Sequence, residues 1–145
     1  MKKTMGVWAA VLALAAATGP AARAAADVPT AVVSGYRGVS VPLSGSQMAF
    51  IKKGDRVDVM ITFEARLKEG KEKVTATILQ NVGVLDVQKP EKLDGKGAVE
   101  LLCNPNEAQY LALSEMQGEL SVAVRAEGDT LMKPMEMASL RKLFK

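Results

Sequence analysis

Hydrophobic and polar residues alternate along much of the chain, and a period of two is typical of β-strands that bury one face. The pattern is clearest over residues 57–63, where Val, Val, Ile and Phe occupy every second position. It also covers residues 36–43, a segment that contains Pro42. Because proline cannot donate a hydrogen bond to a neighbouring strand, Pro42 places this strand at a sheet edge or at its own end. Both segments are predicted strands.

Turns and an irregularity are predicted around these strands. Residues 44–47 are expected to form a loop, and residues 53–55 a turn in which glycine supplies backbone freedom. Residues 65–73 suit a hairpin tip or loop, after which the alternation resumes. Its interruption at Gln80-Asn81 indicates a bulge or bend, through which the strand would pass from one sheet layer to another.

One helix is predicted near residues 105–117. Asn104 is a suitable N-cap, Pro105 suits the first helical position, and Glu107 completes a capping box. Gly118 is expected to end the helix. The apolar stripe expected to face the core consists of Ala108, Leu111, Ala112 and Met116. With further strands over 98–103 and 120–125, the predicted fold is mainly β, a small barrel or folded sheet with one helix.

The chain divides into three parts. Residues 1–26 predict a signal peptide, because Lys2 and Lys3 precede an apolar stretch and Ala24–Ala26 offers a small-residue cleavage site. An uncleaved anchor is the alternative, although the stretch is shorter than the roughly 20 apolar residues that span a bilayer. Residues 27–129 form the predicted β domain, and residues 130–145 a C-terminal tail. The protein is therefore expected to be exported.

Composition changes the list of plausible functions. Three of the 19 basic residues lie in the leader, so the rest of the chain has 16 basic and 16 acidic residues. A net charge of zero argues against nucleic-acid binding, which needs clustered positive charge. Histidine is absent, and with it the commonest general base and metal ligand. The single cysteine, Cys103, lies at an alternating apolar position and is expected to be buried.

These observations predict no catalytic residue, no cofactor and no metal site, and hence no enzyme. A carboxylate hydrolase acting on the cell wall stays open as an alternative, because two of the 16 acidic residues could converge in the fold. The tail has two interpretations. Met137, Leu140 and Phe144, with basic residues around them, could form a short amphipathic helix that touches a partner or membrane. A frayed or self-docked C-terminus is the preferred one.

Three short motifs in residues 35–87, referred to below as the family words, resemble motifs of a known protein family. They are G-Y-R-G-V-S-V-P, F-I-K-K-G-D-R-V-D-V and L-Q-N-V-G-V-L-D-V. In this order they resemble the Flp pilus assembly proteins called CpaB or RcpC, and the resemblance extends to about Arg125. Lys53 stands where the family usually has proline. The family's membrane anchor and earlier I-x-x-G-x-x-L-x-x-x-D-L pattern are not found in this sequence, which indicates a short form.

The resemblance implies a SAF-type, β-clip-like domain and a role in the periplasm. It implies a non-enzymatic assembly or scaffold part of a Tad (type IVb) pilus secretion system, acting beside the outer-membrane secretin. The alternative is a SAF-type ligand-binding or chaperone module, for carbohydrate or peptidoglycan or of the flagellar P-ring kind. Membrane contact is expected only through an uncleaved leader or the tail, and the oligomeric state stays open.

The family words also supply candidate interaction residues, which are Gly54, Asp55, Arg56, Val57, Asp58, Gln80 and Asn81. Taken from the residues alone, Arg56 and Asp58 lie two positions apart and so share one face of their strand. The two side chains could pair or meet charges on a neighbouring strand. A solvated strand face is the preferred interpretation over a binding site, because surface ion pairs of this kind are common and weak.

Overall fold

The computed structural model describes residues 27–68 and 70–144. The predicted leader, residues 1–26, lies outside the described residues. The elements in chain order are β1 (Arg37–Ser44), α1 (Gly45–Met48), β2 (Arg56–Leu67), β3 (Gly70–Gln88), β4 (Lys96–Cys103), α2 (Pro105–Gln117), β5 (Glu119–Val124), β6 (Ala138–Ser139) and α3 (Leu140–Leu143). The prediction of a mainly β, SAF-like fold is confirmed, and α2 coincides with the predicted helix.

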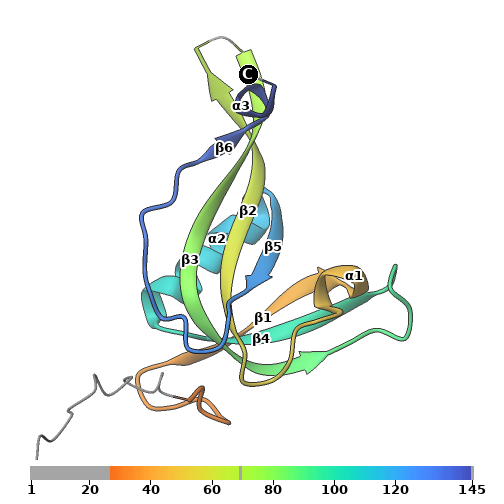
Figure 1. Ribbon diagram of the computed structural model, residues 1–145, viewed down its shortest axis with the longest axis vertical. Coiled ribbons are helices and arrows are strands. Elements are labelled where there is room, and N and C mark those ends of the chain that lie inside the picture. Colours follow the sequence, from red (N-terminus) through yellow and green to blue (C-terminus); the bar gives the residue numbers. More distant parts are fainter. Residues whose placement is uncertain (1–26, 69, 145) are drawn as a thin grey trace, which may run out of the picture.

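The strands form an antiparallel sheet in the order β1-β4-β3-β2-β5, and β6 adds to β3. β2 and β3 make a long twisted ribbon, and β1 and β4 cross its lower end (Figure 1). The helix α2 lies beside the ribbon, next to β5 (Figure 1). As Pro42 predicts, β1 is an edge strand, and among the described strands it pairs with β4 alone.

The long strand β3 joins the two parts of the sheet. It pairs with β2 through residues 70–83 and with β4 through residues 83–88. Between the pairs Val57–Val82 and Val59–Leu79, the single residue Asp58 of β2 stands opposite two residues of β3. This irregularity confirms the bulge predicted at Gln80-Asn81, and it marks the place where β3 leaves β2 and crosses towards β4.

The core lies inside the curled sheet and contains the alternating residues of the predicted strands. Its buried members are Val41, Leu43, Met48, Ile51, Val57, Val59, Ile61, Leu79, Val82, Val84, Val99, Leu101, Cys103, Leu111 and Leu120. The alternation therefore identified the correct inward faces of β1 and β2.

The loop expected at residues 44–47 is wrong, because the chain forms the short helix α1 there. The Ser44 hydroxyl caps this helix by accepting a hydrogen bond from the Gln47 amide. Met48 is fully buried and Ile51 almost so. Burial of these two side chains draws the connection inward, where its backbone groups need the partners that a helical turn provides.

Helix α2 begins as predicted but faces the sheet differently. Asn104 caps it, and the capping box with Glu107 is complete. The expected buried stripe is partly wrong: Leu111 is buried, whereas Ala112 is exposed and Met116 is 84% exposed. Because the chain enters β5 immediately after Gly118, the helix is turned so that its 108–111–114 side faces the sheet.

Gly118 ends α2 as predicted, without adopting a left-handed conformation. Its φ is −168°, an extended conformation that any residue adopts. A Cβ at this position would lie 2.3 Å from the carbonyl oxygen of Thr62 on β2. Glycine is therefore required by the close approach of two backbones.

Replacing Gly118 with alanine is expected to destabilise the protein by about 2 kcal/mol, as overpacking does elsewhere. The added methyl group meets backbone atoms, which cannot move aside without distorting β2. Urea unfolding followed by circular dichroism measures the effect. Gln117→Ala, at the exposed neighbouring position, is the control and should change stability by less than about 0.5 kcal/mol. Equal losses in the two variants would contradict the close-approach explanation.

Candidate functional site

The residues of the second and third family words meet at the bulge of β3. One Asp58 carboxylate oxygen lies 2.7 Å from Nη1 of Arg125, at the end of β5, and 2.9 Å from the backbone nitrogen of Asn81. Asn81 has a φ of 60°, so the bulge places it in the left-handed region that asparagine tolerates better than most residues. Asp58 thus satisfies the amide that the bulge removes from the regular ladder.

Arg56 holds the same bulge from the other side. Its Nη1 donates to the backbone oxygen of Asn81 at 3.2 Å and to the side-chain oxygen of Asn81 at 3.4 Å. The backbone oxygen of Arg56 accepts from the amide of Arg125 at 2.8 Å. We refer to Arg56, Asp58, Asn81 and Arg125 as the bulge cluster. It ties β2, β3 and β5 together at one point.

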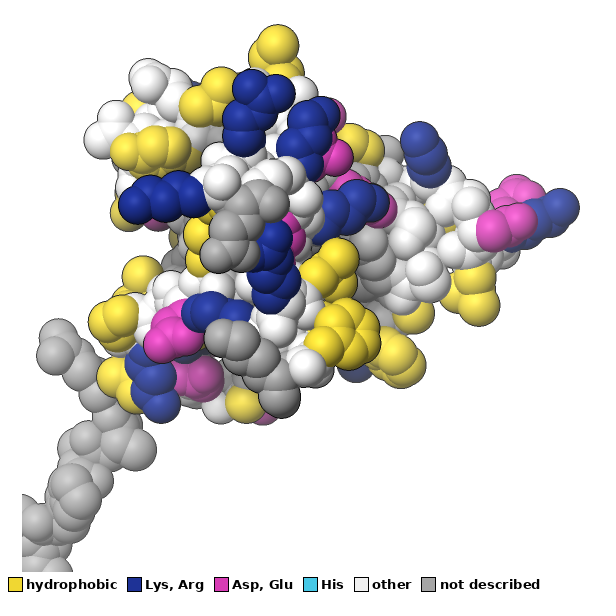
Figure 2. Space-filling model, turned by 90° about the horizontal axis from the view of Figure 1, so that it is seen from above, with side chains coloured by type: hydrophobic (Ala, Val, Ile, Leu, Met, Phe, Trp, Pro, Cys, Tyr) yellow, Lys and Arg dark blue, Asp and Glu magenta, His cyan; other side chains and the backbone are white. Residues whose placement is uncertain are grey.

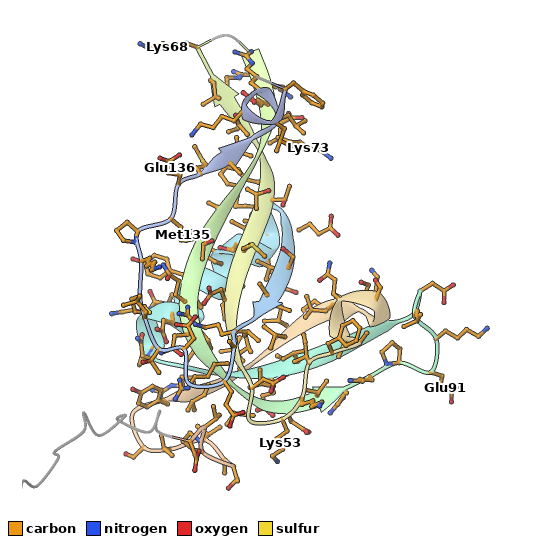
Figure 3. The ribbon with its side chains drawn as sticks, in the orientation of Figure 1. Lys53, Lys68, Lys73, Glu91, Met135 and Glu136 are labelled. Atoms are coloured by element: carbon orange, nitrogen blue, oxygen red, sulfur yellow. The ribbon has the colours of Figure 1, made fainter. Side chains whose placement is uncertain are left out.

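The turn at Gly54-Asp55, before β2, is hydrogen-bonded to the same region of β3. Gly54 has a φ of 89°, which favours glycine, and its amide donates to the oxygen of Val84 at 2.9 Å. The Asp55 carboxylate accepts from the Lys52 amide at 2.8 Å, and the Asp55 carbonyl accepts from the amide of Val84. Lys53 points away from the body (Figure 3), so the structure needs no particular side chain where the family usually has proline.

Arg125 and Gln80 also hold the beginning of the C-terminal tail. The guanidinium of Arg125 lies 3.1 Å from the Asp129 carboxylate and donates to the Leu131 oxygen. Gln80 makes two hydrogen bonds to the backbone of Lys133, at 2.7 and 3.1 Å. The Leu131 amide and then Arg125 lower the pKa of Asp129, while the hydrogen bond to Asp58 is the main cause that raises the pKa of Arg125. Both groups stay charged at neutral pH.

The farther end of the tail rests on the upper part of the β2–β3 ribbon. β6 pairs with Val74 and Thr75, and the buried carboxylate of Glu72 accepts from the amide of Arg141 at 3.0 Å. The helix α3 is only four residues long. Leu140, Leu143 and Phe144 are exposed there, beside the basic side chains of Arg141 and Lys142. Seen from above, apolar and basic side chains lie next to each other on this end of the molecule (Figure 2).

The structure corrects the preferred interpretation of Arg56 and Asp58 as a solvated strand face. Both are partly buried, and each has specific partners. Arg125, whose side chain is only 7% exposed, was not among the residues predicted from the sequence. The sequence does show an arginine directly after an alternating strand. It does not show that this arginine binds Asp58, which lies 67 residues away in the chain. All seven candidate residues lie at or beside the bulge and the turn that meets it.

Two clefts flank the bulge cluster. The larger has a volume of about 590 Å³ and is lined by residues 53–56, 125–128 and 27–28. The smaller, of about 370 Å³, lies between Tyr36, Asn81 and Glu107. Val28 packs against Gly83, where a Cβ would lie 2.7 Å from a Val28 methyl group. Within residues 27–68 and 70–144, no group of three or more acidic or cysteine side chains has the arrangement of a metal site.

A family model for the Flp pilus assembly protein RcpC/CpaB matches residues 26–125. The chain belongs to this family. Comparison with curated proteins and with solved structures found no significant match. The matched region contains β1 to β5 with α1 and α2, and it ends at Arg125, the last member of the bulge cluster. The tail that Arg125 and Gln80 hold lies beyond it.

Cys103 is buried, as predicted, on the inner face of β4. Burial raises the pKa of its thiol to about 12, with a smaller contribution from the negative charge of Glu107. The thiol therefore stays protonated, and a protonated thiol is a poor nucleophile.

In the folded protein Cys103 is expected not to react with a thiol reagent such as DTNB at mildly alkaline pH. The same sample in denaturant should release one equivalent of chromophore, because the chain has a single cysteine. Rapid reaction of the folded protein would show that the thiol is accessible and would contradict this description of β4.

Proposed function

We propose that this protein is a non-enzymatic assembly or scaffold component of a Tad (type IVb, Flp) pilus secretion system, acting in the periplasm beside the secretin. The family match over residues 26–125 carries the proposal, because the family consists of Flp pilus assembly proteins. The periplasmic place, the secretin as partner and the absence of catalysis are inferences from this membership and from the sequence.

The bulge cluster supports a structural role for the family words. Its charged groups bind each other and the backbone, so they serve to fix β2, β3 and β5 in one arrangement. The Asp58 carboxylate is already engaged by the Arg125 guanidinium and by the Asn81 amide. A rigid domain with clefts beside its turn is suited to holding partner proteins.

The predicted leader supports export. Cleavage after Ala26 would release a domain that starts at Asp27, next to the two clefts at the bulge. In the part of the chain that the structure describes, no helix is long and apolar enough to cross a membrane. The exposed apolar and basic residues of the tail supply a second contact surface, for a protein partner or for the membrane.

Cross-linking in the native cell envelope tests the secretin partnership. A chromosomal copy with an affinity tag is cross-linked in intact cells and purified, and the secretin is quantified in the eluate. We expect the secretin to be enriched over an unrelated tagged periplasmic protein of similar abundance. No enrichment, together with unchanged secretin levels in a deletion strain, would contradict a role beside the secretin.

A further inference from the structure

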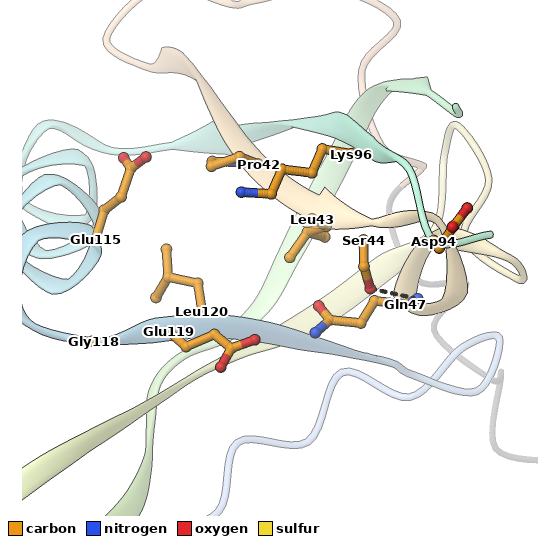
Figure 4. A pocket seen from close by; sticks show the side chains of 10 residues that line it. All are labelled: Pro42, Leu43, Ser44, Gln47, Asp94, Lys96, Glu115, Gly118, Glu119 and Leu120. Carbon is orange, nitrogen blue, oxygen red and sulfur yellow. Dashed lines mark hydrogen bonds between the residues drawn. The ribbon is translucent and has the colours of Figure 1, made fainter. Parts of the chain in front are cut away.

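A third cleft, on a different part of the molecule from the bulge cluster, has the features of a binding site. Its volume is about 270 Å³. It lies between the end of β1 with α1 on one side and the end of α2 with β5 on the other (Figure 4). The residues that line it are Pro42, Leu43, Ser44, Gln47, Asp94, Lys96, Glu115, Gly118, Glu119 and Leu120.

The cleft lies where the sheet does not close. Among the described strands, β1 pairs only with β4 and β5 only with β2, so these two strands end the β1-β4-β3-β2-β5 order and each has a free edge. The edges approach each other at the cleft without forming a ladder. A free edge presents unpaired backbone groups, and extended peptides bind to such edges by adding a strand.

A side-chain oxygen at this cleft lacks a partner. Oε1 of Gln47 is buried and accepts no hydrogen bond within the described residues. The Gln47 side chain extends towards the space between Leu43 and Glu119 (Figure 4). A buried acceptor without a donor is unfavourable, so a ligand that brings a hydrogen-bond donor would relieve this cost.

The charge and shape of the cleft indicate which chemical groups its ligand must have. Three carboxylates, Asp94, Glu115 and Glu119, line the cleft against one amine, that of Lys96. In the described part of the chain, no hydrogen bond or ion pair engages these carboxylates. Leu43 and Leu120 supply an apolar floor. The volume is below the ~300–1,000 Å³ that encloses a whole small molecule, which favours a single long side chain.

We propose that this cleft binds a lysine or arginine side chain of an extended polypeptide that lies along the free edge of β5. The aliphatic part of the side chain packs on Leu43 and Leu120, as long basic side chains do on apolar surfaces. The cationic end donates to Gln47 and to the carboxylates of Glu115 and Glu119. The backbone of the peptide pairs with β5, so its side chains alternate between the two faces of the added strand and one of them enters the cleft. The inference does not depend on the pilus role, because it rests on this cleft alone.

Fluorescence anisotropy with the exported form of the protein tests the proposal. The probe is a labelled synthetic peptide of alternating lysine and threonine, long enough to span β5. The matched probe replaces every lysine by glutamate. We expect saturable binding of the lysine peptide that weakens with salt, and no binding of the glutamate peptide. The double variant Glu115→Gln/Glu119→Gln should bind the lysine peptide about tenfold more weakly.

A control variant distinguishes binding of the lysine peptide at the cleft from nonspecific electrostatic attraction to the protein surface. Glu91→Gln removes one negative charge in the exposed loop between β3 and β4, away from the body of the molecule (Figure 3). It should leave the affinity unchanged. The Gln47→Leu variant, which removes the unpartnered oxygen, should weaken binding without lowering the midpoint of the unfolding transition. Equal affinity of the wild type and the Glu115/Glu119 variant would overturn the proposal, and so would absence of binding by the lysine peptide.

A failed secretin cross-link with intact peptide binding would refute the proposed function only.

Discussion

Replacing Asp58 with alanine is expected to lower the free energy of unfolding by about 3 kcal/mol. The change leaves the guanidinium of Arg125, whose side chain is 7% exposed, without its closest carboxylate. It also leaves the Asn81 amide, displaced from the ladder by the bulge, without an acceptor. A partly buried charge and a partly buried amide that each lose a partner both incur a desolvation cost. Chemical unfolding followed by circular dichroism measures the loss.

Glu64→Ala is the matched control for this prediction, because Glu64 lies on the same strand, β2. Its partner is Lys71, at 2.8 Å, and the side chains are 53% and 62% exposed. The hydrogen bond to Lys71 lowers the pKa of Glu64, but water screens the pair. The unfolding midpoint of Glu64→Ala should stay close to that of the wild type. Similar decreases in the free energy of unfolding for Asp58→Ala and Glu64→Ala would contradict the conclusion that the bulge cluster stabilises the fold more than an exposed ion pair does.

The second large effect is expected at Leu111. Leu111→Ala should destabilise the protein by about 3 kcal/mol, within the range measured for buried leucines. Leu111 is 1% exposed and is the only fully buried side chain among the residues of α2. Its removal leaves a cavity between the helix and the sheet and deletes the main apolar contact that holds α2 in place. The measurement is the same unfolding experiment.

Leu113→Ala provides the comparison, with the same chemical change two positions along the same helix. Leu113 is 59% exposed, so its truncation should change stability by less than about 0.5 kcal/mol. The two variants have the same helix propensity, and their difference reports burial alone. If Leu113→Ala were the more destabilising variant, the helix would face the sheet through another side than the structure shows.

Local patterns predicted most of the elements of this fold. Alternation identified the strands and their inward residues, because a half-buried strand repeats every two residues. Asn104, Pro105 and Glu107 marked the start of α2, since the orphan amides of a helix need such partners. The phase change at Gln80-Asn81 predicted the bulge, because an extra residue moves the following side chains to the other face.

Local sequence patterns could not predict the features that depend on contacts between distant parts of the chain. The rotation of α2, which exposes Met116, depends on how the helix and the following strand pack on β2, where Gly118 lies close to Thr62. The helical turn at residues 45–48 follows from the burial of Met48 in the core. At the candidate site, the family words indicated where to look. They did not indicate that Asp58 would meet Arg125 at the end of β5. Such partners depend on which strands become neighbours.

Membership of the RcpC/CpaB family implies a role for this protein in pilus assembly. The most direct measurement is the number of surface pili on a strain that lacks the gene, counted by electron microscopy and compared with the same strain carrying the gene on a plasmid. We expect pili to be lost in the deletion strain and to return on complementation. A deletion strain with as many pili as its parent would contradict it.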